Sequence, residues 1–301
     1  MSRIGGSDVP RLGLGTMALT GRGTWGDPPD PAAARALLRH AAQLGVALFD
    51  TADSYGPETA ERLLREALHP YDGLLIATKG GFRRHGPHEW EADCRPESLR
   101  AACEGSLRRL GVERIDLYQL HLVDERVPVE ESIGALCDLQ RQGKIRDIGV
   151  CNVGEGQLAR ARATAEIVSV QNRFSLVEQR SRPVLERCER DGLAFIAWAP
   201  LGKGFLASST GALASVAARH GATPGQVALA WVHRSPAAFA IPGTASAAHL
   251  EENVAAGLLE LTDEDVAELG RDAFHGYRAR RLARRARARA GRAKARLRGS
   301  R

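Results

Sequence analysis

Short apolar runs alternate with amphipathic stretches along most of the chain. Eight runs have the length and composition of buried strands: residues 12–14, 46–49, 74–78, 115–120, 145–150, 167–170, 194–198 and 238–241. Each run is followed, after a loop, by a predicted helix, and the clearest helices are residues 96–110, 129–142, 181–190 and 224–233. Prolines near the helix starts and glycines after the helix ends support these boundaries. Thr262, with Asp265 three residues later, resembles a capping box and predicts one more helix.

The alternation of strands and helices predicts the fold class. Repeated β-α units whose strands are apolar throughout need a parallel sheet covered by helices. Eight units in about 270 residues favour a closed (β/α)8 TIM barrel over an open sheet, as a single domain over residues 1–270. The segment Gly13–Ala18 fits the dinucleotide fingerprint G-x-G-x-x-A, but a stretch rich in Gly and Pro follows it where that fingerprint needs a helix. We therefore expect no Rossmann domain.

Charge is distributed unevenly along the chain. The formal net charge is +6, yet residues 276–301 contain twelve Lys or Arg and no acidic residue, so the rest of the chain has a net charge of −6. We expect residues 271–301 to form a basic extension, rich in Arg and Ala, that is flexible or partly helical. Association with nucleic acid or with an acidic membrane is an alternative that rests on this tail alone.

Composition argues against several other classes of protein. No apolar run approaches the roughly 18 to 20 residues that span a bilayer, and the first residues lack the apolar core of a signal peptide. We therefore expect a cytoplasmic protein without a membrane segment. The five cysteines form no C-x-x-C pair, so reduced cysteines are favoured over disulfides and over a metal site.

Polar and aromatic side chains follow the predicted strands at the points where the strands end. They are Asp50 with Tyr55 close behind it, Lys79, His121, Asn152, Gln171 and Trp198. Each of them alone has an ordinary explanation, such as a turn residue, a solvated cation or a core histidine. In a barrel, however, the carboxyl ends of all the strands converge on one mouth. We therefore expect these side chains to face one cavity.

Asp50, Tyr55, Lys79 and His121, which we call the tetrad, suit proton transfer to a carbonyl oxygen. A free tyrosine hydroxyl has a pKa of about 10. An ammonium about 4 Å away is worth roughly 4 kcal/mol at an effective dielectric constant of about 20, so Lys79 is predicted to lower the pKa of Tyr55 by up to about 3 units. Asp50 would keep Lys79 charged, and a neutral His121 would donate a hydrogen bond to the carbonyl.

The reaction that the tetrad suits needs a hydride, and no side chain can supply one, so a nicotinamide cofactor is expected. Asn152 and Gln171 offer hydrogen-bonding groups for the carboxamide of a nicotinamide, and Trp198 offers a flat face for its ring. Strand-end carboxamides and a core tryptophan are the ordinary alternatives for these three positions.

From about Arg11 to Leu269 the sequence resembles the aldo-keto reductase superfamily. The resemblance is carried by the segments LGLGTM, GVALFDTADSYG, IATKGG, SLRRLGVERIDLYQLH, EESIGALCDLQRQGKIRDIGVCN, VQNRFSL, WAPLGKGFL and IPGTASAAHLEENVAA. It implies a barrel that binds NADPH in extended form across its mouth. It also implies that Tyr55 is the acid and base. Asp50 and Lys79 would then tune the pKa of Tyr55, and His121 would orient the carbonyl.

The resemblance implies further cofactor contacts, with some departures from the family pattern. Serine and tyrosine are usual where this chain has Cys151 and Trp198. Besides Asn152, Gln171 and Trp198, the expected contacts are Leu201, Lys203, Thr244, Ser246, His249, Glu252 and Asn253. The 2′-phosphate would lie near Thr244, Ser246 and His249 at a helix N-terminus, and adenine near Glu252 and Asn253. We expect NADPH as the cofactor, with NADH left open.

The substrate is less closely defined. The segments GDPPDP, YGPETAERLLREALHPY and IPGTASAAHLEEN resemble bacterial reductases that act on pyridoxal, and also general aldehyde reductases. We expect a small-molecule carbonyl substrate, with pyridoxal as one candidate. Trp25, Phe82 and Trp90 lie in predicted loops that could wall an aromatic aldehyde. A catalytically silent cofactor-binding subunit is the alternative, although all four tetrad positions hold the residue types that the family has.

Overall fold

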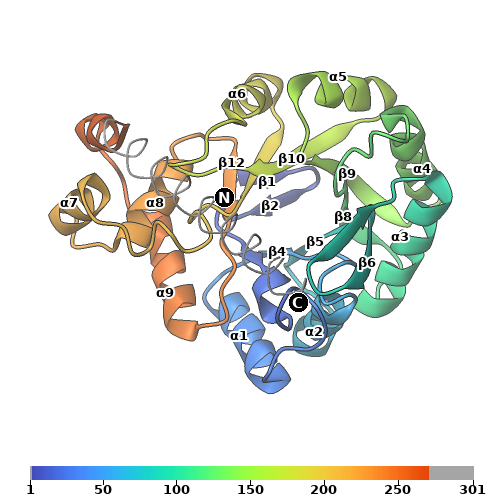
Figure 1. Ribbon diagram of the computed structural model, residues 1–301, viewed down its shortest axis with the longest axis horizontal. Helices are drawn as coiled ribbons and strands as arrows, with labels where there is room; N and C mark the ends of the chain where they lie inside the picture. Colours follow the sequence, from blue (N-terminus) through green and yellow to red (C-terminus); the bar gives the residue numbers. More distant parts are fainter. Residues whose placement is uncertain (1, 271–301) are drawn as a thin grey trace, which may run out of the picture.

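Parallel strands form the central sheet of the protein (Figure 1). They are β3 (Leu14–Gly15), β4 (Leu48–Asp50), β5 (Leu75–Gly80), β8 (Ile115–Leu120), β9 (Ile145–Cys151), β10 (Ile167–Arg173), β11 (Ala194–Trp198) and β12 (Ala238–Ile241). In this computed structural model, which describes residues 2–270, these eight strands pair in the order β12, β11, β10, β9, β8, β5, β4 and β3. The predicted basic extension, residues 271–301, lies outside the described residues.

Hydrogen bonds between β12 and the residues that lead into β3 close the sheet into a ring. The amide of Gly13 donates to Ala240 O at 2.9 Å, and the amide of Ala240 donates to Arg11 O at 2.9 Å. A Cβ at Gly13 would lie 2.7 Å from Leu48 O, so only glycine fits where the chain enters β3 beside β4. A 3-10 turn, η1 (Thr16–Leu19), follows β3 in place of the helix that a dinucleotide fingerprint needs. The predicted (β/α)8 barrel is confirmed.

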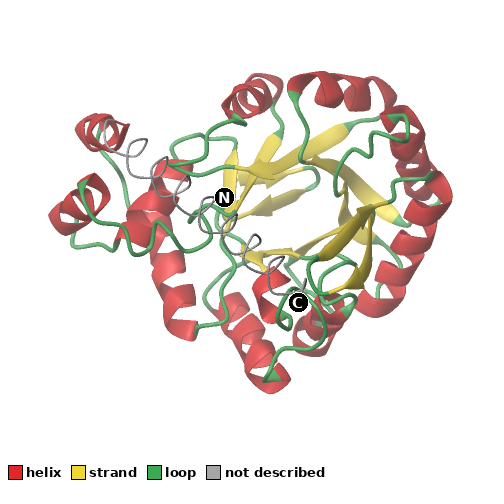
Figure 2. Ribbon diagram, in the orientation of Figure 1, coloured by secondary structure: helices red, strands yellow, loops and turns green. Residues whose placement is uncertain are grey.

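Helices surround the ring of strands on its outside (Figure 2). They are α1 (Pro31–Gln43), α2 (Thr59–Leu68), α3 (Pro96–Leu110), α4 (Val129–Arg141), α5 (Glu155–Thr164), α6 (Arg182–Asp191), α7 (Ala212–Arg219), α8 (Pro224–Val232), α9 (Ala247–Ala255) and η2 (Ala256–Leu258). The predicted helix over residues 96–110 has the bounds of α3, and the other three predictions differ from α4, α6 and α8 by at most one residue at either end.

A capping box begins the last helix that the structure describes. The amide of Asp265 donates to the Thr262 hydroxyl at 3.2 Å, and the amide of Thr262 donates to the Asp265 carboxylate at 3.0 Å. Residues 263–270 are helical. The helix predicted from the spacing of Thr262 and Asp265 is therefore confirmed.

An antiparallel hairpin, β1 (Ser2–Ile4) and β2 (Ser7–Val9), closes the amino-terminal end of the barrel. Ile4 and Val9 are buried and pack against the side chains of Leu48, Leu117 and Phe239 inside the ring. The hairpin lies within the ring in Figure 1. This end of the barrel is filled with apolar side chains. The polar residues at the carboxyl ends of the strands lie at the opposite mouth.

A second antiparallel hairpin, β6 (Phe82–Gly86) and β7 (Glu89–Ala92), follows β5 at the carboxyl-terminal mouth. The sequence did not predict it, because its two short strands are rich in charged residues and contain no apolar run. It pairs only with itself in the described sheets and stands apart from the eight strands of the barrel. The hairpin matters for the site because it carries Phe82 and Trp90.

Candidate active site

The tetrad is assembled at the carboxyl-terminal mouth as the sequence predicted. The Lys79 ammonium donates to Asp50 Oδ2 at 2.6 Å, to Thr51 O at 2.8 Å and to the Tyr55 hydroxyl at 3.5 Å. Asp50 ends β4 and Lys79 lies near the end of β5, so neighbouring parallel strands bring the two charges together. Lys79 is 0% exposed and Asp50 is 2% exposed, which makes their ion pair a buried one.

His121 lies on the other side of Tyr55, with 5.8 Å between the two ring centroids. Burial, reinforced by the charge of Lys79, holds the pKa of His121 well below its usual value of 6.5. Its ring is therefore neutral at pH 7, as the sequence reasoning required. Within residues 2–270, the buried Nδ1 atom of His121 has no hydrogen-bond partner, so the protein leaves that nitrogen unused.

The pKa of Tyr55 differs from the prediction. Burial raises it to about 12, although the Lys79 ammonium acts in the opposite direction. Lys79 lowers the pKa of Tyr55 as predicted, but the expected net lowering does not result, because loss of water around the hydroxyl outweighs one charge at 3.5 Å. Burial would also lower the pKa of Lys79, but the Asp50 carboxylate raises it above its ordinary value. At neutral pH the tyrosine therefore keeps its proton and the lysine stays charged.

Two carboxamides complete the surroundings of the Asp50 carboxylate. Gln171 Nε2 donates to Asp50 Oδ1 at 2.6 Å, and Gln119 Nε2 lies 3.4 Å from the same oxygen. The Cys151 thiol donates to Gln119 Oε1 at 3.5 Å, so it points into this buried network. Sequence reasoning missed Gln119. The available signal was its position in β8 two residues before His121, because side chains two residues apart along an extended chain point to the same side.

Asn152 and Trp198 lie together beside the tetrad. Asn152 follows β9 with a φ of 58°, a left-handed conformation that asparagine tolerates better than most residues. Its Nδ2 donates to His121 O at 3.0 Å, and Trp198 Nε1 donates to its Oδ1 at 3.0 Å. The structure therefore connects Trp198, Asn152 and His121 through two hydrogen bonds.

The other expected cofactor contacts form a second group, around the start of α9 and the loop after β11. The amide of Ser246 donates to the Thr244 hydroxyl at 3.0 Å, and Ser246 caps α9 by accepting from the amide of His249. Glu252 accepts a hydrogen bond from the hydroxyl of Thr223, the N-cap residue of α8. The remaining three differ in exposure: Lys203 is exposed, Leu201 is half-buried and Asn253 is buried.

Aromatic side chains of the β6–β7 hairpin cover the tetrad. The Trp90 ring lies edge to face with Tyr55 at 6.5 Å between centroids, and Phe82 lies 4.7 Å from the His121 ring. The centroids of Phe82 and Trp90 are 5.3 Å apart. Tyr55 and His121 are each only 7% exposed, so the tetrad is closely covered instead of lining a wide cavity.

Comparisons with known proteins agree with this geometry. The model of the Aldo/keto reductase family matches residues 11–271. The chain belongs to the aldo/keto reductase family. The chain is 42% identical over 274 residues to the pyridoxine 4-dehydrogenase of Escherichia coli, covering 88% of this chain and 96% of that protein. It is 44% identical to the "uncharacterized oxidoreductase C215.11c" of Schizosaccharomyces pombe, covering 89% and 88% of the two chains.

Solved structures give the same assignment. An aldo-keto reductase from Klebsiella pneumoniae in complex with NADPH superposes with a TM-score of 0.78 at 28% sequence identity, covering 90% of this chain and 93% of that one. Together with the family match and the oxidoreductase relatives, this makes the protein an NAD(P)H-dependent oxidoreductase.

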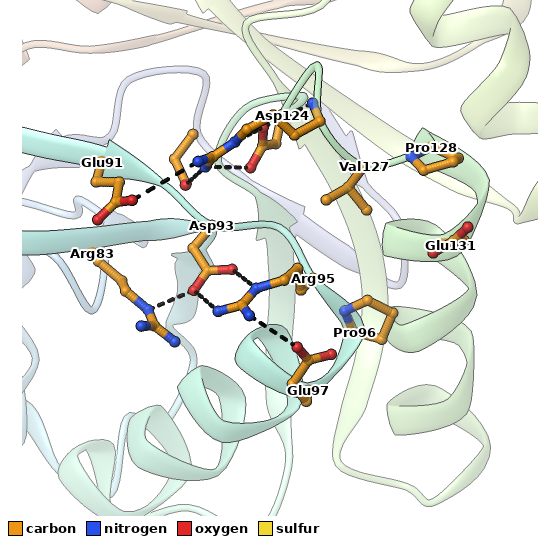
Figure 3. A pocket seen from close by; sticks show the side chains of 12 residues that line it. Arg83, Glu91, Asp93, Arg95, Pro96, Glu97, Asp124, Val127, Pro128 and Glu131 are labelled. Atoms are coloured by element: carbon orange, nitrogen blue, oxygen red, sulfur yellow. Dashed lines mark hydrogen bonds and ion pairs between the residues drawn. The ribbon is translucent and has the colours of Figure 1, made fainter.

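A cavity of about 710 Å³ beside the β6–β7 hairpin does not include the tetrad (Figure 3). It lies between the β6–β7 hairpin and the start of α4 and is lined by charged side chains. Several of those charges pair with one another: Asp93 pairs with Arg83 at 2.5 Å and with Arg95 at 2.8 Å. The volume of this cavity therefore does not make it the candidate site, and the chemistry of the tetrad does. A smaller cavity, of about 280 Å³, is lined in part by Asn152.

Within residues 2–270, no group of three or more His, Cys, Asp or Glu side chains is arranged to hold a metal ion. The five cysteines are free thiols. None of the helices in the same range is both long enough and apolar enough to cross a membrane.

Proposed function

We propose that the protein reduces an aldehyde or ketone to the alcohol, with NADPH as the hydride donor and pyridoxal as the substrate to test first. The observation that carries this proposal is the buried series of hydrogen bonds from Asp50 through Lys79 to Tyr55, beside a neutral His121. In this arrangement the Tyr55 hydroxyl carries a proton and the Lys79 ammonium provides a fixed positive charge next to it. These two groups suit the protonation of a developing alkoxide.

The residues around the tetrad fit a nicotinamide cofactor. Within residues 2–270, the Asn152 carboxamide uses one N–H on His121 O and one lone pair on Trp198 Nε1, so each end keeps a further position for a ligand. Gln171 directs its amide nitrogen at Asp50 and Gln119, so its carbonyl oxygen is the atom it can offer. We assign Asn152, Gln171 and Trp198 to the nicotinamide end, where the bound cofactor supplies the hydride.

The remaining contacts are assigned to the rest of the cofactor. Leu201 and Lys203 would lie along the pyrophosphate, and Thr244, Ser246 and His249 beside the 2′-phosphate. Glu252 and Asn253 would contact the adenine. The amides at the start of α9 favour an anionic group, which supports NADPH over NADH. Because the Ser246 hydroxyl already caps α9, its amide neighbours are better placed than its hydroxyl to meet a phosphate.

Each tetrad side chain has a separate task in the proposed reaction. His121 donates a hydrogen bond to the substrate carbonyl and so orients it. Tyr55 gives its proton to the carbonyl oxygen as negative charge develops there. Lys79 then stabilises the tyrosinate that remains, and Asp50 keeps Lys79 charged and aimed at Tyr55. The raised pKa of Tyr55, about 12, means that the tyrosinate recovers a proton readily at neutral pH.

Pyridoxal is favoured by two observations. The E. coli relative that shares 42% of its residues with this chain is named a pyridoxine 4-dehydrogenase. The rings of Phe82 and Trp90, next to His121 and Tyr55, offer faces and edges to a planar heteroaromatic aldehyde.

The test is NADPH oxidation, followed by absorbance, with pyridoxal and with a small set of aromatic and aliphatic aldehydes. We expect turnover with NADPH and weaker turnover with NADH. The Tyr55→Phe variant should lose about 10²- to 10⁴-fold in kcat while it still binds NADPH, because only the proton donor is removed. Wild-type turnover by Tyr55→Phe would disprove its role. Cofactor binding by the wild-type protein without turnover of any carbonyl would indicate a silent binding subunit instead.

A further inference from the structure

Arg84 of β6 occupies an unusual position between three segments of the mouth. Its Nε donates to Glu89 O at 2.9 Å, and its two Nη atoms donate to four more backbone carbonyls. These four acceptors are Thr24 O at 2.8 Å, Ser54 O at 2.7 Å, Gly23 O at 3.1 Å and Gly86 O at 3.2 Å. One side chain therefore links the loop over residues 21–26, the residue before Tyr55 and both strands of the β6–β7 hairpin.

The hydrogen bonds of Arg84 use the full capacity of its guanidinium. A guanidinium has five N–H donors, and five backbone oxygens accept from Arg84. All five acceptors are neutral. The Arg84 guanidinium is half-buried, and this burial lowers its pKa. A lysine could not replace it, because an ammonium has three donors and no planar fork.

The flat face of the same guanidinium supports two tryptophans. Its central carbon lies 3.8 Å from the centroid of the Trp90 ring and 5.6 Å from that of Trp25. Trp90 is 37% exposed, so protein packing alone does not fix its ring. Arg84 therefore holds Trp90 from one side, while the ring meets Tyr55 on another at 6.5 Å.

Backbone contacts confirm that the three segments form one unit around Arg84. The amide of His88, in the hairpin turn, donates to Gly23 O at 3.2 Å. The amide of Gly26 donates to Gly56 O at 2.6 Å, which ties the loop over residues 21–26 to the chain just after Tyr55. A shift of Arg84 would therefore move the hairpin, the loop and the surroundings of the Tyr55 hydroxyl together.

We propose that Arg84 is a positioning residue that fixes Trp90 over the tetrad and thereby makes the site select planar, ring-bearing carbonyl compounds over open-chain ones. This inference rests on the proposed reductase function. A ring fixed in place gains more from stacking and edge contacts than a mobile ring, because less freedom is lost on binding. An open-chain aldehyde has no flat face and gains little from the same ring.

The first experiment compares two lysine variants of neighbouring arginines. Arg84→Lys keeps the positive charge but loses the planar guanidinium with its five donors. Arg83→Lys is the matched control, because Arg83 is exposed on the same strand and pairs with Asp93. The measured quantity is the ratio of kcat/KM for benzaldehyde to kcat/KM for propanal. We expect Arg84→Lys to lower this ratio about two- to tenfold, chiefly through KM for benzaldehyde, and Arg83→Lys to leave it unchanged. An equal loss on both aldehydes, or no loss on either, would overturn the proposal.

A second variant tests whether Arg84 acts through Trp90. Trp90→Leu replaces a partly exposed ring and leaves Arg84 in place, so the variant remains informative even if Arg84→Lys folds poorly. It should lower the same selectivity ratio, and adding Arg84→Lys to it should lower the ratio little further. If the two single effects on the ratio add in full, Arg84 does not act through Trp90 and the inference is wrong.

A measurement without turnover separates this inference from the proposed function. Chymotrypsin cuts after Phe82 and Trp90, so its cleavage rate in the folded protein reports how firmly the hairpin is held. We expect Arg84→Lys to be cut at least several-fold faster in the hairpin than the wild type, and Arg83→Lys to match the wild type. Equal cleavage rates for Arg84→Lys and the wild type would contradict the inference that Arg84 holds the hairpin in place. Absence of carbonyl turnover in the wild type would instead contradict the proposed function.

Discussion

Two parts of the mouth are built in different ways. The strand ends carry Asp50, Lys79, Gln119 and Gln171, whose side chains bind one another directly, with two contacts of 2.6 Å to the Asp50 carboxylate. The hairpin and the loops around it are held instead by Arg84, which donates hydrogen bonds to five backbone carbonyls and packs on the rings of Trp25 and Trp90. The chemistry is therefore fixed by side chains on the rigid barrel, whereas the shape of the substrate region depends on a few loop contacts.

The largest effect is expected among the side chains at the strand ends. Lys79→Met leaves the buried Asp50 carboxylate without its cation, and breaking a buried pair in this way costs about 3–5 kcal/mol of stability. Without the ammonium, the tyrosinate also loses its stabilising charge, so kcat should fall by about 10²- to 10⁴-fold. Denaturant unfolding and steady-state kinetics measure the two losses separately.

The matched control for Lys79→Met is the double variant with Asp50→Asn. Removing both charges should recover part of the lost stability and none of the activity, because the carboxamide needs no counter-ion. If the double variant is as unstable as Lys79→Met alone, the uncompensated carboxylate is not the cause of the loss.

A smaller effect is expected at Gln119, which also lies near the end of a strand. Gln119→Met removes a hydrogen-bond donor 3.4 Å from Asp50 Oδ1 and an acceptor for Gln171, but it keeps the volume of the side chain. Loss of these contacts should cost about 1–3 kcal/mol of stability and about tenfold in kcat/KM. The exposed Gln142→Met is the control and should change neither quantity. An unaltered kcat/KM for Gln119→Met would show that Gln171 alone suffices to orient Asp50.

The barrel and the tetrad could be predicted because they follow from periodicity. Apolar runs with the right spacing predict parallel strands, and the ends of parallel strands meet at one mouth, so Asp50, Lys79 and His121 had to lie close together. The β6–β7 hairpin could not be predicted in the same way. Its stability comes from Arg84 and from contacts with distant loops, and no local apolar pattern marks such an element.

The ionisation of Tyr55 shows a second limit of the sequence. Lys79 could be identified as a neighbour, but the degree of burial depends on how Phe82, Trp90 and the barrel close over the hydroxyl. Burial proved the larger influence on its pKa. Cofactor contacts such as Glu252 and Asn253 come from resemblance alone, because the fold does not by itself show which loop side chains a cofactor meets.

A pH-dependent effect is expected at Asp53, which lies in the loop after β4. Burial, with a further contribution from Glu61, raises the pKa of Asp53 to about 8, and its Oδ1 atom has no partner within residues 2–270. The unfolded chain releases this proton near pH 3.8. Asp53 therefore lowers the free energy of unfolding progressively as the pH rises from about 4 to 8, since the folded state retains a proton that the unfolded state has lost.

Replacing Asp53 tests this linkage. Asp53→Asn should stabilise the protein more at pH 8 than at pH 5, and urea unfolding of both proteins at the two pH values measures the difference. Asp72→Asn, on an exposed residue of the loop before β5, is the control for the substitution itself. The assignment fails if wild type and Asp53→Asn change in parallel between the two pH values.

The smallest effect is expected where the chain departs from the family pattern at Cys151. Its thiol is buried and donates to Gln119 Oε1 at 3.5 Å, inside the network around Asp50. Burial holds the pKa of this thiol far above its usual value, so it remains a neutral donor, as a serine hydroxyl would be. Cys151→Ser exchanges a weak donor for a stronger one with the same partner and should change kcat/KM by less than about threefold. A much larger change would mean that position 151 contacts the cofactor directly, and NADPH titration of the two proteins would then show altered affinity.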